Sequence, residues 1–130
     1  MLKISITAIP HADHPYPTAG NYWRPAGAQP GELEIRVSRM ADRRHEYLLA
    51  LHELVEAILC EARGIDFDAI TRFDIAFERS RADGDLSEPG EAAQAPYRAE
   101  HRVAEIIERI AAHELGVDWN DYSRAIARLD

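Results

Sequence analysis

The segment that most constrains the fold is residues 42–63, DRRHEYLLALHELVEAILCEAR, whose composition predicts one long amphipathic helix. Leu, Ala, Glu and Arg dominate it, and neither Pro nor Gly interrupts it before Gly64. Asp42 is a good N-cap, and Gly64 suits the turn that ends a helix. Because such a helix is stabilised mainly by packing of its apolar face, the rest of the chain is expected to be arranged around it.

Winding this segment at roughly 100° per residue places its aliphatic side chains on one face. They are Leu48, Leu51, Val55, Ile58, Leu59 and Ala62. His45, His52 and Glu56 fall at one side of that arc, with further apolar residues beyond them. Imidazole and carboxylate groups within an apolar surface need partners, because leaving them unpaired is costly. A metal ion is one such partner, and an internal salt bridge, among themselves or with a neighbouring arginine, is another.

The motif HELVE, residues 52–56, is the strongest chemical feature of this helix. Residues four apart on a helix project to the same side, so His52 and Glu56 can hold one ion between them. The motif resembles H-E-x-x-H of the zincin metallopeptidases, with Glu56 where that motif has its second His, and strands precede the helix in both. The resemblance gives Glu53 the role of general base, activating a water held by the metal.

A zincin-type site takes a third ligand from a later helix, and His101 is the best candidate in this chain. Glu105 and Glu108 follow it on the same side of that helix, and they are candidates for further ligands or outer partners. His45 is another. The predicted cofactor is therefore a divalent metal, with zinc the preferred identity, and the substrate by analogy is a small molecule or peptide containing an amide bond.

Two segments before the central helix alternate between apolar and polar residues, as half-buried strands do: 2–9 and 33–39. Three segments after it carry helical patterns: 68–79, 97–115 and 119–129. Two strands alone are marginally stable, so helices are expected to cover them. The prediction is a single α+β domain, in which a small antiparallel sheet packs on the central metal-site helix with two or three further helices around it.

The helix predicted over 97–115 has an aliphatic stripe that is expected to face the core. It consists of Val103, Ile106, Ile107 and Ile110. His101 and Glu108 lie away from this stripe, at the edge of the polar face, where water is expected to reach them. Asp68 is the expected N-cap of the shorter helix before it.

Two loops are candidates for contacts with other molecules. Residues 11–31 are rich in Pro and aromatic residues, and Tyr16 and Trp23 there are candidate substrate-binding residues. Residues 80–96 are acidic and polar. If the protein is a non-catalytic accessory protein that binds a protein partner, residues 14–25 and 80–96 are the expected contact surfaces.

Charge and hydropathy limit the other functions. A net charge of −8 and a pI near 5.2 argue against binding to a nucleic-acid backbone. No apolar run approaches the roughly 20 residues that span a bilayer. Cys60 is the single cysteine, which excludes an internal disulfide and fits a cytoplasmic location. A minor alternative is a Mg²⁺-dependent nucleotide pyrophosphohydrolase, in which carboxylates such as Glu53, Glu56, Asp74 and Glu78 would hold the ion.

Several stretches together resemble a family of small uncharacterised proteins encoded in phages and prophages. They are IPHADHPYPTAGNYW, LEIRVSRM, HELVEAILCEARGI, FDIAFE, and EPGEAAQAPYRAEH leading into LGVDWNDY. They cover nearly the whole chain. The resemblance implies a length and a layout, and it implies no established activity.

Overall fold

A three-stranded mixed sheet forms one layer of the molecule. The computed structural model describes residues 1–130, and its strands are β1 (Lys3–Ile9), β2 (Gly20–Trp23) and β3 (Glu32–Ser38), in the order β1-β3-β2. Four helices accompany this small sheet, which confirms the predicted α+β class.

The pairing of the two predicted strands differs from the expectation. β1 and β3 are parallel, with Ile6 beside Ile35, whereas the prediction was an antiparallel pair. The connection over residues 10–31 is long enough to return the chain to the end at which β1 started. It also contributes β2, which pairs antiparallel with β3 and places Tyr22 opposite Ile35. A strand of four residues beside prolines is too short for apolar alternation to reveal.

The helices begin and end within one or two residues of the predicted bounds. They are α1 (Arg43–Ala62), α2 (Phe67–Arg79), α3 (Arg98–Glu114) and α4 (Trp119–Ala127), with short 3-10 turns η1 (His11–Asp13) and η2 (Pro89–Glu91). Asp42 caps α1 as predicted, whereas α2 is capped by Asp66, whose side chain accepts the N–H of Asp68. None of these helices has both the length and the apolar composition that crossing a bilayer would require.

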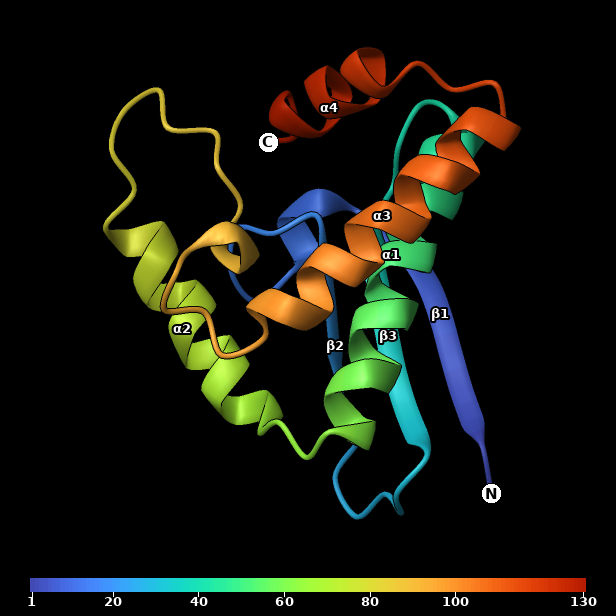
Figure 1. Cartoon of the computed structure of the whole chain (residues 1–130), viewed down its shortest axis with the longest axis vertical. Coiled ribbons are helices and arrows are strands. Elements are labelled where there is room, and N and C mark those ends of the chain that lie inside the picture. The colour runs from blue at the N-terminus through green and yellow to red at the C-terminus, as the bar shows by residue number, and fades with distance from the viewer.

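The central helix α1 is covered on two sides. It packs against β3 and β2 on one side and against α3 on another, so that it lies between the sheet and α3 (Figure 1). The apolar core includes Leu33, Ile35 and Val37 of β3 with Leu48 and Cys60 of α1. Because α1 contacts both the sheet and α3, side chains on its inner surface can meet residues from either.

Helix α3 is turned the opposite way from the prediction. Its aliphatic stripe faces outward: Val103, Ile106, Ile107 and Ile110 are 37%, 58%, 37% and 61% exposed. Its buried face carries small and polar residues: Glu100, His101, Ala104, Glu108 and Ala112. The alanines let α3 approach α1 closely, and the buried polar groups find partners there, which removes the cost of burying them.

Candidate metal centre

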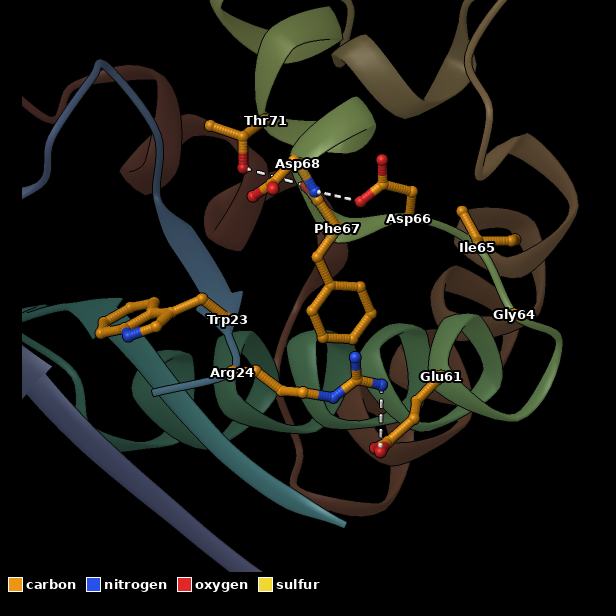
Figure 2. Close-up of a pocket in the computed structure, with 9 residues that line it drawn as sticks. All are labelled: Trp23, Arg24, Glu61, Gly64, Ile65, Asp66, Phe67, Asp68 and Thr71. Carbon is orange, nitrogen blue, oxygen red and sulfur yellow. Dashed lines mark hydrogen bonds and ion pairs between the residues drawn. The ribbon is translucent and has the colours of Figure 1, made fainter. Parts of the chain in front are cut away.

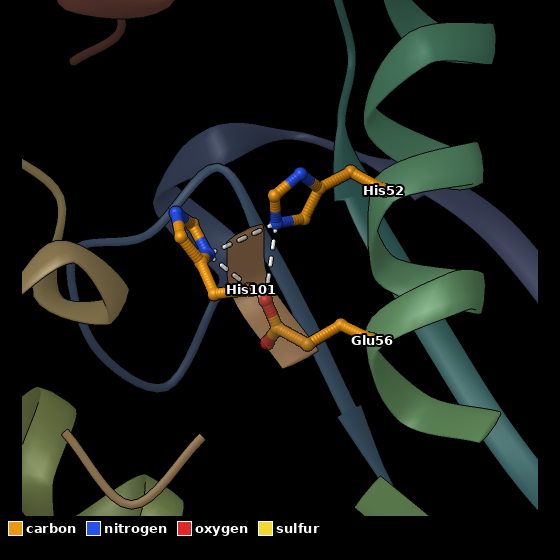
Figure 3. A group of neighbouring side chains, drawn as sticks. All are labelled: His52, Glu56 and His101. Carbon is orange, nitrogen blue, oxygen red and sulfur yellow. Dashed lines mark hydrogen bonds and ion pairs between the residues drawn. The ribbon is translucent and has the colours of Figure 1, made fainter. Parts of the chain in front are cut away.

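Two imidazoles and one carboxylate meet between α1 and α3. His52 and Glu56 lie one turn apart on α1, and His101 comes from the first part of α3 (Figure 3). His52 Nε2 lies 3.0 Å from Glu56 Oε2 and 3.2 Å from His101 Nδ1. His101 Nδ1 lies 3.0 Å from the same Glu56 oxygen. All three side chains are buried, so their donor atoms form a compact triangle shielded from water.

This triangle has the dimensions that a divalent cation requires. With metal–ligand bonds of about 2.0–2.2 Å, tetrahedral ligand atoms lie roughly 3.3–3.6 Å apart. The observed separations of 3.0–3.2 Å would need only a small outward movement of the side chains. Two imidazole nitrogens and one carboxylate oxygen are a donor set that zinc uses in sites where a fourth position stays open. No arginine or lysine contacts the three residues.

The outer nitrogen of His52 is held by a second carboxylate. His52 Nδ1 lies 2.7 Å from Glu108 Oε1, and the hydroxyl of Tyr122 donates to Glu108 Oε2 at 2.5 Å. Glu108 and Tyr122 are both buried. A carboxylate on the outer nitrogen of a metal-binding imidazole fixes the orientation of the ring and makes the inner nitrogen a stronger ligand.

The other two side chains are oriented in a similar way. Glu88 Oε2 lies 2.9 Å from the outer nitrogen of His101, Nε2. Tyr22 of β2 donates its hydroxyl to Glu56 Oε1 at 2.8 Å, which leaves Oε2 directed at the two imidazoles. Hydrogen bonds with Glu108 and Tyr22 therefore orient His52 and Glu56, whereas Glu88 lies at ion-pair distance from His101 without forming a hydrogen bond.

The carboxylates around the two imidazoles favour a positive charge at this point. Burial alone would lower the pKa of His101, but its contacts with Glu56 and Glu88 raise that pKa to about 10. Burial likewise opposes the charged form of His52, and Glu108 and Glu56 raise its pKa well above the usual range. Burial would raise the pKa of Glu56, but the two imidazoles lower it. The same carboxylates that hold protons on the rings can hold a cation between them.

Glu53 lies beside the triangle and is free of other partners. Its carboxylate makes no hydrogen bond or ion pair, and it lines the cleft that also contains His52 and Glu56. Its side chain packs against Gly20 of β2, where an added Cβ would lie 2.6 Å from Glu53 Cγ. Burial and the nearby charge of Glu56 raise the pKa of Glu53. A glycine at position 20 is what lets this carboxylate lie against β2.

The cleft beside the three residues has a volume of about 690 Å³. Tyr16 lines it, as does Asp74 of α2, whose carboxylate accepts hydrogen bonds from Tyr16 at 3.3 Å and from Tyr97 at 2.5 Å. His11 also lines the cleft. The cleft is large enough for a small molecule or a few residues of a peptide.

The other predicted site residues lie elsewhere. Glu105 lines the cleft but pairs with Arg109 and does not contact the imidazoles. His45 lies near Asp42 and packs beside Tyr122. Trp23 lines a separate pocket of about 350 Å³, with Arg24 and Phe67 (Figure 2), so it does not border the candidate metal centre. Glu108, which was expected at a water-exposed edge, is buried at the centre.

Several residues of the site have no signal in the sequence. Tyr22 of β2 contacts Glu56, and Glu88 from the turn before α3 lies next to His101. Tyr122 of α4 contacts Glu108, the outer partner of His52. Gly90 has no side chain that could collide with His101, since a Cβ there would lie 2.4 Å from the ring. Glycine and proline in a loop are ordinary features, so nothing in EPGE predicts contact with an imidazole.

Comparison with known proteins identifies no relative, because no family model, curated protein or solved structure matches the chain. The chemistry of the centre is therefore interpreted from its own geometry. Two imidazoles and a carboxylate could hold a cation, and an unpaired carboxylate beside an open cleft could accept a proton.

Proposed function

We propose that this protein binds a divalent cation, zinc being the best fit, through His52, Glu56 and His101. We further propose that it is a zincin-like hydrolase in which Glu53 is the general base, with an amide or peptide bond as the substrate by analogy. The observation that carries the proposal is the convergence of three buried donor atoms within 3.0–3.2 Å of one another.

Two further observations support it. Both imidazoles have a carboxylate beside the nitrogen that faces away from the shared point, Glu108 for His52 and Glu88 for His101. A carboxylate hydrogen-bonded to the outer nitrogen, as Glu108 is to His52, is usual around metal-binding histidines. An internal salt bridge would satisfy the same groups, but with both rings protonated it would leave two positive charges 3.2 Å apart, which is electrostatically unfavourable.

The residues around the cleft would divide the work of hydrolysis. A bound cation would supply Lewis-acid polarisation of the scissile carbonyl. Glu53, which has no competing partner, would take the proton from the attacking water and pass it to the leaving amine. Tyr22 holds Glu56 in place, and Gly20 leaves the space that Glu53 occupies.

The four-carboxylate Mg²⁺ site is less well supported. Asp74 is bonded to two tyrosines, and Glu78 pairs with Arg81 at 2.8 Å. The ligand atoms of Asp74, Glu78, Glu53 and Glu56 also do not all lie within 4.8 Å of one another.

Zinc analysis of untagged protein tests the proposal, because a histidine tag would itself bind zinc. Wild-type protein, dialysed against zinc and then against buffer, should retain at least one equivalent, measured by elemental analysis. His52→Ala should lose it, and Glu53→Gln should keep it. At zinc concentrations about 100-fold above Kd, binding should also stabilise the fold by about 2.7 kcal/mol in wild type and not in His52→Ala.

A protein that holds no zinc, and unfolds at the same temperature with and without it, would contradict the metal-binding proposal. A protein that holds zinc, but whose slow cleavage of test peptides is unchanged by Glu53→Gln, would contradict the catalytic part alone.

Partner binding is a second candidate function, in line with the resemblance to phage and prophage proteins. It is favoured by the outward stripe of α3, because four neighbouring β-branched residues are costly to leave in water. The exposure of this stripe supports α3 as a further contact surface, and residues 14–25 and 80–96 remain predicted contact surfaces. Metal-free wild type and His52→Ala of equal stability would leave this candidate as the better one.

A further inference from the structure

The outer nitrogen of His101 is buried and has no hydrogen-bond partner. The residue is 4% exposed. Its Nε2 is one of two buried side-chain nitrogen atoms in the chain that have no hydrogen-bond partner. Glu88 Oε2 lies only 2.9 Å away, but not in a direction that allows a hydrogen bond. Since an unmade hydrogen bond on a buried polar atom is costly, a cation held between this nitrogen and the carboxylate would satisfy both groups.

A second carboxylate lies on the same side of the ring. One donor atom from each of Glu88, Glu91 and His101 lies within 4.8 Å of the others. Glu88 caps the turn Pro89–Glu91, and the backbone of this turn lies close to the ring, because a Cβ at Gly90 would be 2.4 Å from His101 Cγ. Both carboxylates are exposed, so a cation can reach them from solvent.

The charge around the two imidazoles exceeds what one cation would neutralise. Glu53, Glu56, Glu88 and Glu108 all lie around the two rings, and none of them pairs with an arginine or lysine. With Glu91 they make five carboxyl groups, of which Glu53 favours its neutral form because burial and the charge of Glu56 raise its pKa. One dication would leave a clear excess of negative charge in a partly buried place, where such an excess is unfavourable.

We propose that Glu88, Glu91 and His101 Nε2 hold a second divalent cation, so that the imidazole of His101 bridges two metal ions. The inference rests on the proposed first site, which would take the other nitrogen of the same ring. With metal–nitrogen bonds of about 2.0–2.1 Å, the two ions would lie roughly 6 Å apart. The ring binds as imidazolate, and its remaining proton leaves to solvent.

The two positions differ in accessibility, and this sets the order in which they fill. The first is enclosed by buried donors from α1 and α3, whereas the second uses two exposed glutamates. The second ion is therefore the weaker bound and the first to be removed by a chelator.

Zinc titration of the untagged full chain by calorimetry tests the inference. Wild type should bind two equivalents per chain. In Glu91→Gln the first zinc ion should bind as in wild type, and the second should bind at least tenfold more weakly. Glu114→Gln, an exposed glutamate at the end of α3, is the matched control and should bind two. If Glu91→Gln fails to fold, as judged by circular dichroism, Glu88→Gln makes the same comparison.

Titration with Cu²⁺ followed by electron paramagnetic resonance tests the bridge itself. The first equivalent should give an ordinary signal, and the second should remove most of it, because imidazolate couples the two spins. One equivalent of zinc in wild type, two in Glu91→Gln, or two independent copper signals would each overturn the inference. If wild type binds one equivalent of zinc and His52→Ala binds none, the second site is overturned and the proposed function stands. If wild type binds no zinc, the second site and the proposed function are both overturned.

Discussion

The two long faces of α3 are the reverse of what an amphipathic helix usually presents. The inner face carries His101, Ala104 and Glu108, all buried, and the outer face carries Ile106 and Ile110, which are more than half exposed. Glu108 and His101 form hydrogen bonds with residues of α1 and α4, while the outer aliphatic side chains have no partner. Specific polar contacts therefore decided the orientation of this helix against its apolar pattern.

The difference shows which surface of the helix is occupied by polar contacts. Burying the apolar stripe of α3 against the core would have stabilised the fold by about 25 cal/mol for each Å² of apolar surface removed from water. Its exposure indicates that the inner surface of α3 is shaped for the imidazole–carboxylate cluster. The outer surface is then left for another contact.

The largest effect is expected from placing a charge on each face in turn. Ala104 is fully buried, so Ala104→Glu adds an unpaired carboxylate beside others and should lower the free energy of unfolding by about 3–5 kcal/mol. Ile106→Glu, two residues away on the outer face, should change it by less than about 1 kcal/mol. Urea denaturation of metal-free protein measures both. Equal losses would show that the outer stripe is buried in solution.

Gly90→Ala tests the close contact on the inner face. An added Cβ would lie 2.4 Å from the ring of His101, so the variant should be less stable by about 1–3 kcal/mol and should bind zinc more weakly. Without that collision, the same substitution would stabilise the protein by about 0.4–1 kcal/mol. The sign of the change in thermal unfolding therefore decides whether the turn contacts the ring.

Glu108→Gln tests the outer partner of His52. The amide cannot accept from the ring as strongly as the carboxylate does, so zinc affinity should fall about 10- to 100-fold. Glu114→Gln, on the exposed end of the same helix, should leave the affinity unchanged. A competition titration with a coloured zinc chelator measures both. An unchanged affinity in Glu108→Gln would be inconsistent with a metal on His52.

The smallest effect is a pH dependence at the start of α3, where Asp74 accepts from Tyr97. Burial, aided by the charge of Glu56, raises the pKa of Asp74 to about 6 from an ordinary 3.8. A raised carboxyl pKa stabilises the fold below pH 4, and this stabilisation is lost as pH rises towards 6. The stability of wild type minus that of Asp74→Asn should therefore decrease between pH 4 and 6. A flat difference, like that expected for Glu114→Gln, would contradict the raised pKa.

The sequence by itself determined the local structure and the first two donors. The composition of residues 42–63, its cap at Asp42 and its stop at Gly64 act within a few residues, so the bounds of α1 followed from them. The spacing of His52 and Glu56 is likewise a property of one helix, and it places both side chains on one side in any fold.

Only the tertiary structure decided how these parts meet. A periodic pattern marks an apolar arc, but it does not say which side of the helix will find better partners, and so it predicted the wrong face for α3. The parallel pairing of β1 with β3 and the contacts of Tyr22, Glu88 and Tyr122 depend on residues far apart in the chain. Their distances are set by how the chain returns on itself, and local spacing carries no information about that return.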